Sequence, residues 1–294
     1  MNGVKGQIRQ SLSGYYDVVT PEGKEIRTRA RGVFRKRRQT PLVGDWVEFK
    51  MENDEGYLLK IDPRKNELVR PPIANVDAAI VVSACTQPDF SSNLLDRQLV
   101  MLESNGIQPL LYFSKGDLLS VSAQTTMQTI IDYYGQYYPV AFRKDKTALN
   151  IDNLLKGLKN QVIVVMGQTG AGKSTFLNDL NSTLNLATGE ISKALSRGRH
   201  TTRKVTLMKI HDNLIADTPG FSSFDLLNIS KEDLPNYYPD FLQYRDQCKY
   251  RGCLHVNEPA CKVKEQVAAG KILKSRYDNY LQFHNVILQQ KPRY

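Results

Sequence analysis

The segment GQTGAGKS at residues 167–174 has the composition and spacing of a phosphate-binding loop. It matches the pattern G-x-x-x-x-G-K-[ST], follows the apolar run VIVVM and opens a helix-like stretch, TFLNDLN. Its glycines allow backbone N–H groups to turn towards phosphate oxygens, Lys173 offers a positive charge to the outer phosphates, and the Ser174 hydroxyl can ligate Mg²⁺. The residues expected to bind nucleotide here are Gly167, Gln168, Thr169, Gly170, Ala171, Gly172, Lys173, Ser174 and Thr175.

A second motif, DTPG at residues 217–220, follows the strand-like run NLIA and lies 44 residues after Lys173. The carboxylate of Asp217 can hold Mg²⁺ through water, and the Gly220 N–H can face the γ-phosphate. DTPG alone would be an ordinary turn, but its distance from the phosphate loop favours a role in the same site.

The segment SRGRHTTR at residues 196–203 lies between these motifs and suits a switch loop that orders around Mg²⁺ and the γ-phosphate. Thr202 is the residue whose hydroxyl is predicted to face the metal, and Thr201 is the second choice; a flexible surface loop is the alternative.

Phe221 stands where many GTPases carry a water-orienting Gln, and an apolar side chain cannot orient water. We therefore expect His200 to position the attacking water, the alternative being that it packs or contacts RNA.

The segment FSKGD at residues 113–117 is similar to the Asn-Lys-x-Asp signature by which GTP-binding proteins read guanine. Asp117 can accept hydrogen bonds from guanine N1–H and the exocyclic amine, and the Lys115 stem can cover the base. ATP lacks both donors on that edge, so the carboxylate would discriminate against it. Ser114 replaces the usual Asn and has a shorter side chain to brace the phosphate loop.

This base-reading segment precedes the phosphate loop, whereas in most GTPases it follows. In a doubly wound sheet the ligand-binding loops lie at the carboxyl ends of the strands, whatever order the chain visits them. Chain termini lie close together in many domains, so a permuted order is tolerated. The order predicts a circularly permuted GTPase whose switch loops immediately precede the C-terminal segment and can pull on it.

The central segment, residues 73–228, alternates between apolar runs and helix-like stretches, which predicts βα units and a mostly parallel sheet. The apolar runs are AAIVVSA, PLLYFS, YYPVAF and QVIVVMG, and the helix-like stretches lie near 94–104, 121–134, 150–159 and 173–184. Residues 205–210 and 213–217 could add a hairpin.

Residues 1–72 contain β-rich pieces, GYYDVVT, EIRTRARGVF, DWVEFK and GYLLKI, separated by turn signals such as PEGK and NDEG. Five short strands of this kind predict a small barrel of the oligonucleotide-binding (OB) type, ending at a Pro71-Pro72 linker. A basic cluster with Phe34 among it suits RNA phosphate contacts plus stacking, although a solvated hairpin face is the alternative. Its basic residues are Arg27, Arg29, Arg31, Arg35, Lys36, Arg37 and Arg38.

The net charge of +10 is unevenly distributed. Residues 1–72 hold 15 Lys and Arg against 10 Asp and Glu, and residues 229–294 hold 11 against 7, while residues 73–228 hold 14 against 13. Two basic flanks around a nearly neutral centre indicate a polyanionic partner, with general solubility charge as the alternative.

Residues 229–294 are predicted to form a mainly helical zinc-binding domain. Three of the four cysteines fall between 248 and 261, and no secretion signal precedes them, which favours metal binding over disulfides. The ligands Cys248, Cys253, His255 and Cys261 would fill a closed tetrahedral site, so one Zn²⁺ per chain would be structural; a reduced thiol cluster is the alternative. The aromatics Tyr277, Tyr280 and Phe283 lie at helical spacing and are expected to pack.

In this permuted order, QPDFSSNLLDR (87–97), SKGD, GQTGAGKS, GRHTT (198–202) and DTPG resemble the ribosome-small-subunit-dependent GTPase A family, RsgA, also named YjeQ or YloQ. The resemblance covers nearly the whole chain, including the four Cys and His ligands. It implies a bacterial cytoplasmic factor that binds the 30S subunit and its 16S rRNA late in maturation and hydrolyses GTP there with Mg²⁺, at a rate that the subunit stimulates. Besides Ser114, the loop RKDKT (143–147) departs from the family because it lacks the usual Ser-Ala.

Composition is that of an ordinary globular protein, with 41% hydrophobic and 24% charged residues and no apolar run long enough to cross a membrane. We expect a cytoplasmic monomer with three domains. Two other functions stay open: an ATP-specific P-loop protein in which FSKGD has no role, and an RNA-binding scaffold in which nucleotide only fixes the conformation.

Overall fold

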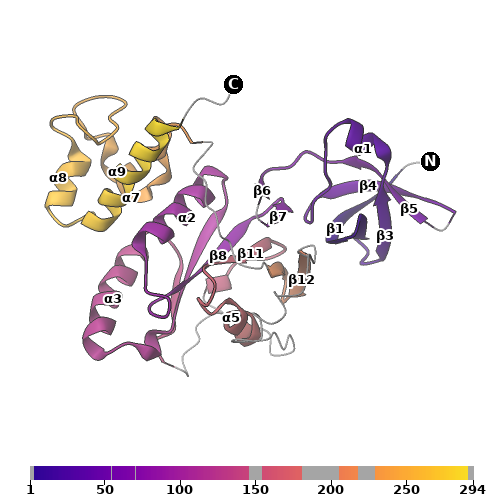
Figure 1. Cartoon of the computed structure of the whole chain (residues 1–294), viewed down its shortest axis with the longest axis horizontal. Helices are drawn as coiled ribbons and strands as arrows, with labels where there is room; N and C mark the ends of the chain where they lie inside the picture. Colours follow the sequence, from indigo (N-terminus) through magenta and orange to yellow (C-terminus); the bar gives the residue numbers. More distant parts are fainter. Residues whose placement is uncertain are drawn as a thin grey trace. The chain divides into compact units, whose positions relative to one another are not determined.

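The computed structural model describes residues 3–53, 55–69, 71–145, 154–180, 205–217 and 229–290. The chain divides into two compact units, each built from two stretches of sequence. One unit comprises Met1–Ile80 and Leu155–Phe221, and the other Val81–Leu154 and Ser222–Tyr294. Figure 1 shows the chain coloured along the sequence and labels many of its helices and strands.

The N-terminal strands of the first unit close into a five-stranded barrel, as predicted. They are β1 (Val4–Leu12), β2 (Tyr15–Val19), β3 (Glu25–Ala30), β4 (Trp46–Glu52) and β5 (Glu55–Ile61). β1 pairs with both β2 and β4, β2 pairs with β3, and β5 lies parallel to β3 and antiparallel to β4, so the ring is complete. Alternate residues such as Ile8, Val18 and Phe49 are fully buried inside it.

The basic cluster departs from the sequence prediction at Phe34. The strand expected to run through EIRTRARGVF ends at Ala30, and a short helix, α1 (Gly32–Lys36), follows. Phe34 is only 3% exposed because the helix turns it into the barrel core. The predicted stacking role of Phe34 is therefore wrong.

The expected linker at Pro71-Pro72 also carries structure. Strand β7 (Pro72–Ala74) pairs antiparallel with β6 (Glu67–Val69). The Ala74 N–H donates to the Val43 carbonyl at 2.9 Å, which ties β7 back to the barrel.

The rest of the first unit contains β11 (Val162–Met166), helix α5 (Lys173–Leu180), β12 (Thr206–Ile210) and β13 (Asn213–Asp217). β11 and β13 run parallel, and β12 and β13 form the predicted antiparallel hairpin. β12 also pairs with barrel strand β1 at Thr206 and Gln10. The predicted helix extension to residue 184 lies outside the described residues.

The second unit begins with the predicted βα alternation. Its elements are β8 (Ala78–Ala84, which starts in the first unit), α2 (Ser92–Ser104), β9 (Gln108–Ser114), α3 (Val121–Tyr134) and β10 (Val140–Phe142). The strand order is β10-β9-β8, with β9 and β10 parallel. Of the helix expected near 150–159, residues 150–153 lie outside the described residues, and the described part is helical at 154–155 and ends in a turn at 156–157.

The C-terminal part of this unit is helical. Its elements are the 3-10 turn η3 (Leu234–Tyr237), α7 (Pro239–Arg245), α8 (Lys262–Ala268) and α9 (Lys274–Gln289). The long amphipathic stretch breaks into α8 and α9 near Gly270, whose φ of +70° is left-handed. No helix in the described part of the chain has both the length and the apolar character to cross a membrane.

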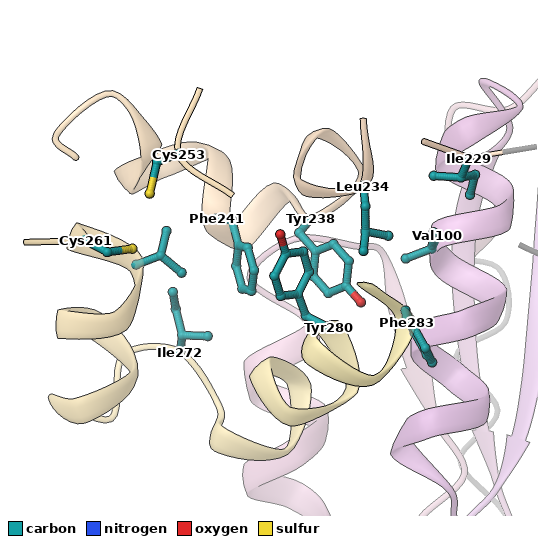
Figure 2. Packing of buried hydrophobic residues seen from close by; sticks show 11 residues of the cluster. Val100, Ile229, Leu234, Tyr238, Phe241, Cys253, Cys261, Ile272, Tyr280 and Phe283 are labelled. Carbon is teal, nitrogen blue, oxygen red and sulfur yellow. The ribbon is translucent and has the colours of Figure 1, made fainter. Parts of the chain in front are cut away.

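An aromatic cluster forms the core of the C-terminal part (Figure 2). Tyr238, Phe241 and Tyr280 face one another with ring centroids 4.8–5.2 Å apart, and Phe283 and Val100 of α2 extend the cluster. All five side chains are fully buried. The expectation that Tyr280 and Phe283 pack is thus confirmed, and α2 shares one apolar core with α9.

Candidate functional site

The phosphate loop joins β11 to α5, the context that the sequence predicts. Gly167, Gly170 and Gly172 have φ values of +146°, +81° and +95°, which side chains with a Cβ rarely adopt. Phe176 and Leu177 anchor α5 in the core with no exposed surface. The loop therefore has a backbone that only its glycines allow and a fixed helix start behind it.

Lys173 folds back over this loop. Its Nζ donates to the main-chain oxygens of Gly167 and Gln168 at 2.8 and 2.7 Å. An ammonium at this point can contact phosphate oxygens held by the loop N–H groups. Ser174 is half-buried in the first turn of α5, where its hydroxyl is available to a metal ion beside the phosphates.

The parallel pairing of β11 with β13 brings the second motif to the same edge of the sheet. Val164 lies opposite Ala216, so the Asp217 backbone follows at the strand end from which the phosphate loop departs. Carboxyl ends of adjacent parallel strands are where ligand-binding loops of α/β sheets gather. Gly220 and the switch residues His200, Thr201 and Thr202 lie outside the described residues.

The base-reading segment lies in the second unit, at the carboxyl end of β9. Lys115 is left-handed with φ of +59°, and its Nζ donates to the Gln87 main-chain oxygen. Ser114 is 4% exposed, and its carbonyl accepts from the Cys85 N–H at 3.0 Å. The proximity of this segment to the phosphate loop of the first unit remains a prediction.

Gly116 holds the base-reading turn tightly against the end of β10. Its N–H donates to the Arg143 carbonyl at 3.0 Å, and a Cβ at this position would lie 2.4 Å from a Phe142 ring carbon. Only glycine fits without displacing that ring. The turn that presents Asp117 is therefore fixed by the strand that follows it.

The four predicted zinc ligands converge, with their ligand atoms all within 4.8 Å of one another. The Cys261 Sγ lies 4.0 Å from the Cys248 Sγ and 3.3 Å from the His255 Nδ1, and the Cys248 Sγ lies 3.7 Å from the same nitrogen. Tetrahedral zinc with ordinary bond lengths separates two sulfurs by about 3.8 Å and sulfur from nitrogen by about 3.5 Å. The cluster is therefore compatible with a Cys₃His zinc site.

The environment of these ligands determines their protonation. Burial lowers the pKa of His255 to about 4, so its imidazole is neutral and has a lone pair for a metal at neutral pH. Burial raises the pKa of the Cys253 thiol to about 12. Metal binding must therefore displace thiol protons.

The basic side chains of the barrel cluster fall into two groups. Arg27 pairs with Asp17 at 2.8 Å, Arg31 with Glu52 at 2.8 Å and Arg29 with Glu55 at 3.5 Å. The side chains at 35–38 are exposed and form no ion pair within the described parts of the chain. The uncompensated positive charge of the cluster therefore lies at α1 and the turn after it.

Sequence reasoning missed a buried polar network in the second unit. Arg276 of α9 donates to Asp96 of α2 at 2.5 Å and to Asp240 of α7 at 2.9 Å, and all three side chains are buried. Tyr134 and Tyr133 of α3 donate to the two carboxylates at 2.6 and 2.7 Å. The segment QPDFSSNLLDR, which contains Asp96, was the one available signal.

Two protein-family profiles match this chain, and both belong to the family that these features suggest. The RsgA N-terminal domain profile matches residues 5–58, and the RsgA GTPase profile matches residues 61–227. Among curated relatives, "Small ribosomal subunit biogenesis GTPase RsgA" of Limosilactobacillus fermentum is 56% identical over 292 residues, covering 98% of each chain. The protein of the same name from Limosilactobacillus reuteri is 55% identical over 292 residues, again covering 98% of both.

Two solved structures share the fold over almost the full length. YloQ, described as a circularly permuted GTPase, aligns with a TM-score of 0.81 and 40% identity over 99% of this chain and 97% of its own. YjeQ from Thermotoga maritima aligns with a TM-score of 0.83 and 31% identity over 99% and 100%. The permuted order of motifs, the barrel and the phosphate loop thus have one common explanation: this chain belongs to the RsgA GTPase family.

Proposed function

We propose that this protein hydrolyses GTP during late maturation of the small (30S) ribosomal subunit and that the subunit stimulates the reaction. The observation that carries the proposal is the phosphate loop with Lys173 folded over it, at the sheet edge that Asp217 reaches. The curated relatives are named as small ribosomal subunit biogenesis GTPases, which supports the same role for this chain.

Within the proposed site, the chain binds and orients the triphosphate. The loop N–H groups and Lys173 hold the phosphates, while Ser174, Thr202 and Asp217 would hold Mg²⁺, which neutralises charge on the phosphate oxygens when bound. His200 would orient the attacking water, since Phe221 cannot.

Guanine selection is proposed for Asp117, with Lys115 over the base and Ser114 beneath the turn. The fixed geometry at Gly116 supports this role because the carboxylate is presented on a constrained turn. Asp117→Asn should shift preference from GTP towards xanthosine triphosphate, which offers a carbonyl where guanine offers an amine. Unchanged nucleotide preference would favour an ATP-specific or base-indifferent P-loop protein.

The barrel is proposed to contact 16S rRNA through its basic cluster, with Arg35–Arg38 foremost because no carboxylate in the described residues neutralises them. One structural Zn²⁺ per chain, a monomeric state and a cytoplasmic location complete the proposal.

Single-turnover hydrolysis of GTP, with and without 30S subunits, tests the function directly. We expect slow hydrolysis by the isolated protein and a large acceleration by subunits. If GTP binds but is not cleaved in either condition, the alternative of an RNA-binding scaffold with a nucleotide-dependent conformation is correct.

A further inference from the structure

The segment Gln87–Arg97, QPDFSSNLLDR, contacts the base-reading turn at its first end. The main-chain oxygen of Gln87 accepts a hydrogen bond from the Lys115 Nζ. Three residues later, the Phe90 ring lies 6.0 Å from the Phe113 ring, directly before the turn. The start of the segment thus contacts Lys115 within the turn that presents Asp117 and Phe113 directly before that turn.

The other end of this segment opens α2 and contacts α9. The Asn93 Nδ2 donates to the Asn279 Oδ1 at 3.0 Å and to the Gln282 Oε1 at 2.7 Å. The Asn279 Nδ2 lies 3.3 Å from the Ser92 Oγ and donates to the Asp96 Oδ2 at 2.7 Å. Two consecutive residues of the first helical turn therefore hold the same amide of α9.

The buried network fixes the register of this contact. Asp96 and Arg276 form an ion pair with 0% and 1% exposed side chains, inside a core that is otherwise largely apolar. Apolar residues of similar volume would often stabilise such an interface equally well, whereas a buried charge pair requires specific groups to face each other. Sliding α9 along α2 by a turn would leave these charges unpaired, so α9 can dock in one register only.

We propose that Gln87–Arg97 couples the base-reading turn to α9, with Asn93 as the positioning residue on the α9 side. The inference rests on the proposed binding of guanine by Asp117. A base held there restrains Lys115 and, through it, Gln87 and the start of α2. Coupling between two binding equilibria is reciprocal, so nucleotide should tighten the docking of α9, and loss of the α9 contact should weaken nucleotide binding.

The test uses the full-length, zinc-loaded chain and follows amide hydrogen exchange in α9, residues 274–289, with and without GDP. In the native chain GDP should slow this exchange. In Asn93→Ala the slowing should largely disappear, and GDP affinity should fall by at least about fivefold, the lower end of usual couplings. Asn93 is half-buried and its loss leaves the Ser91 cap of α2 in place, so the variant should fold and keep its zinc.

Gln128→Ala is the matched control, because Gln128 is a half-buried helical amide of the same unit whose side chain donates to Asp132 of its own helix α3 at 2.7 Å. It should keep both the GDP affinity and the GDP-dependent slowing of amide exchange in α9.

In Asp117→Asn, xanthosine diphosphate in place of GDP should slow exchange in α9. If GDP binds tightly and α9 exchange does not change, the coupling is refuted while the proposed function stands. If Asp117→Asn leaves base preference unchanged, the base-reading role itself fails, and the coupling with it.

Discussion

Arg276 on α9 donates its Nη1 proton to the Oδ1 of Asp96 on α2 across 2.5 Å, and neither side chain is exposed to solvent. The same guanidinium reaches Asp240 on α7 and lies 4.5 Å from the Tyr238 ring centroid. One guanidinium thus pairs with two buried carboxylates and links helices α2, α7 and α9. This arrangement makes the C-terminal helices and α2 a single body, with direct consequences for stability.

Replacing Arg276 should destabilise the second unit strongly. Arg276→Met keeps most of the side-chain volume but leaves Asp96 and Asp240 buried without a cation, which costs about 3–5 kcal/mol. Urea unfolding followed by tyrosine near-ultraviolet circular dichroism would measure the loss, since the single Trp46 lies in the barrel. Lys274→Met removes an exposed i,i+4 pair with Asp278 and should change stability by less than about 1 kcal/mol.

The same variant should show a pH dependence of defined sign. Burial already raises the pKa of Asp96, and Arg276 offsets part of that shift. Without the guanidinium the folded-state pKa rises further, so the folded protein binds more protons than the unfolded chain and loses stability as pH increases. The difference between native chain and Arg276→Met should therefore be smaller at pH 5.5 than at pH 8. An equal difference at both values would contradict an ionised Asp96 paired with Arg276 in the native core.

Lys173→Ala should weaken nucleotide binding. The ammonium is expected to contact the outer phosphates, and charge-assisted bonds of this kind contribute about 1.5–3 kcal/mol, so GDP affinity should fall by roughly 10–150-fold. Titration with a fluorescent GDP analogue would measure it. Lys159→Ala, an exposed lysine of the same unit outside the loop, should bind GDP like the native chain. If both variants bind normally, Lys173 only fastens its own loop.

The phosphate loop and the zinc cluster could be predicted because the residues that form each of them lie in one short stretch of sequence. The glycines around Lys173 and the ligands between Cys248 and Cys261 require their spacing to function, so that spacing is visible in the sequence. Asp96 and Arg276 lie 180 residues apart, and no local pattern distinguishes a buried ion pair from two surface charges. Phe34 was misjudged for a related reason, since a single helical turn reverses which side of the chain faces the core.

Cys253→Ser should abolish zinc binding. The cluster is compatible with four ligands, and loss of one thiolate leaves an incomplete shell. Metal analysis should give one zinc per native chain and less than about a tenth of that in the variant, whose C-terminal helices should also be cleaved faster by protease. Cys85→Ser replaces a buried cysteine that lies outside the cluster and should retain one zinc. A native chain without zinc would instead support a reduced thiol cluster.

His200→Ala tests the proposed water-positioning group. Because Phe221 cannot hydrogen-bond water, removal of the imidazole should lower the subunit-stimulated kcat by about 100-fold or more while GDP affinity changes little. Phe221→Leu keeps an apolar side chain and should leave that kcat nearly unchanged. Normal stimulated turnover in His200→Ala would show that the subunit supplies the catalytic group.

Binding to 30S subunits should weaken steeply with salt, and the two groups of basic residues in the barrel should contribute unequally. Each phosphate contact adds about 0.7–0.9 to the slope of log affinity against log salt. Replacing the four residues at 35–38 by Gln should therefore flatten the slope by up to about 3, because no carboxylate in the described residues shares their charge. Replacing Arg27, Arg29 and Arg31 should flatten it less, since each is paired with a carboxylate in the free protein. A larger effect of replacing Arg27, Arg29 and Arg31 would mean that RNA displaces their carboxylate partners and binds the face of β3. An unchanged slope in both variants would place the RNA contact outside the barrel.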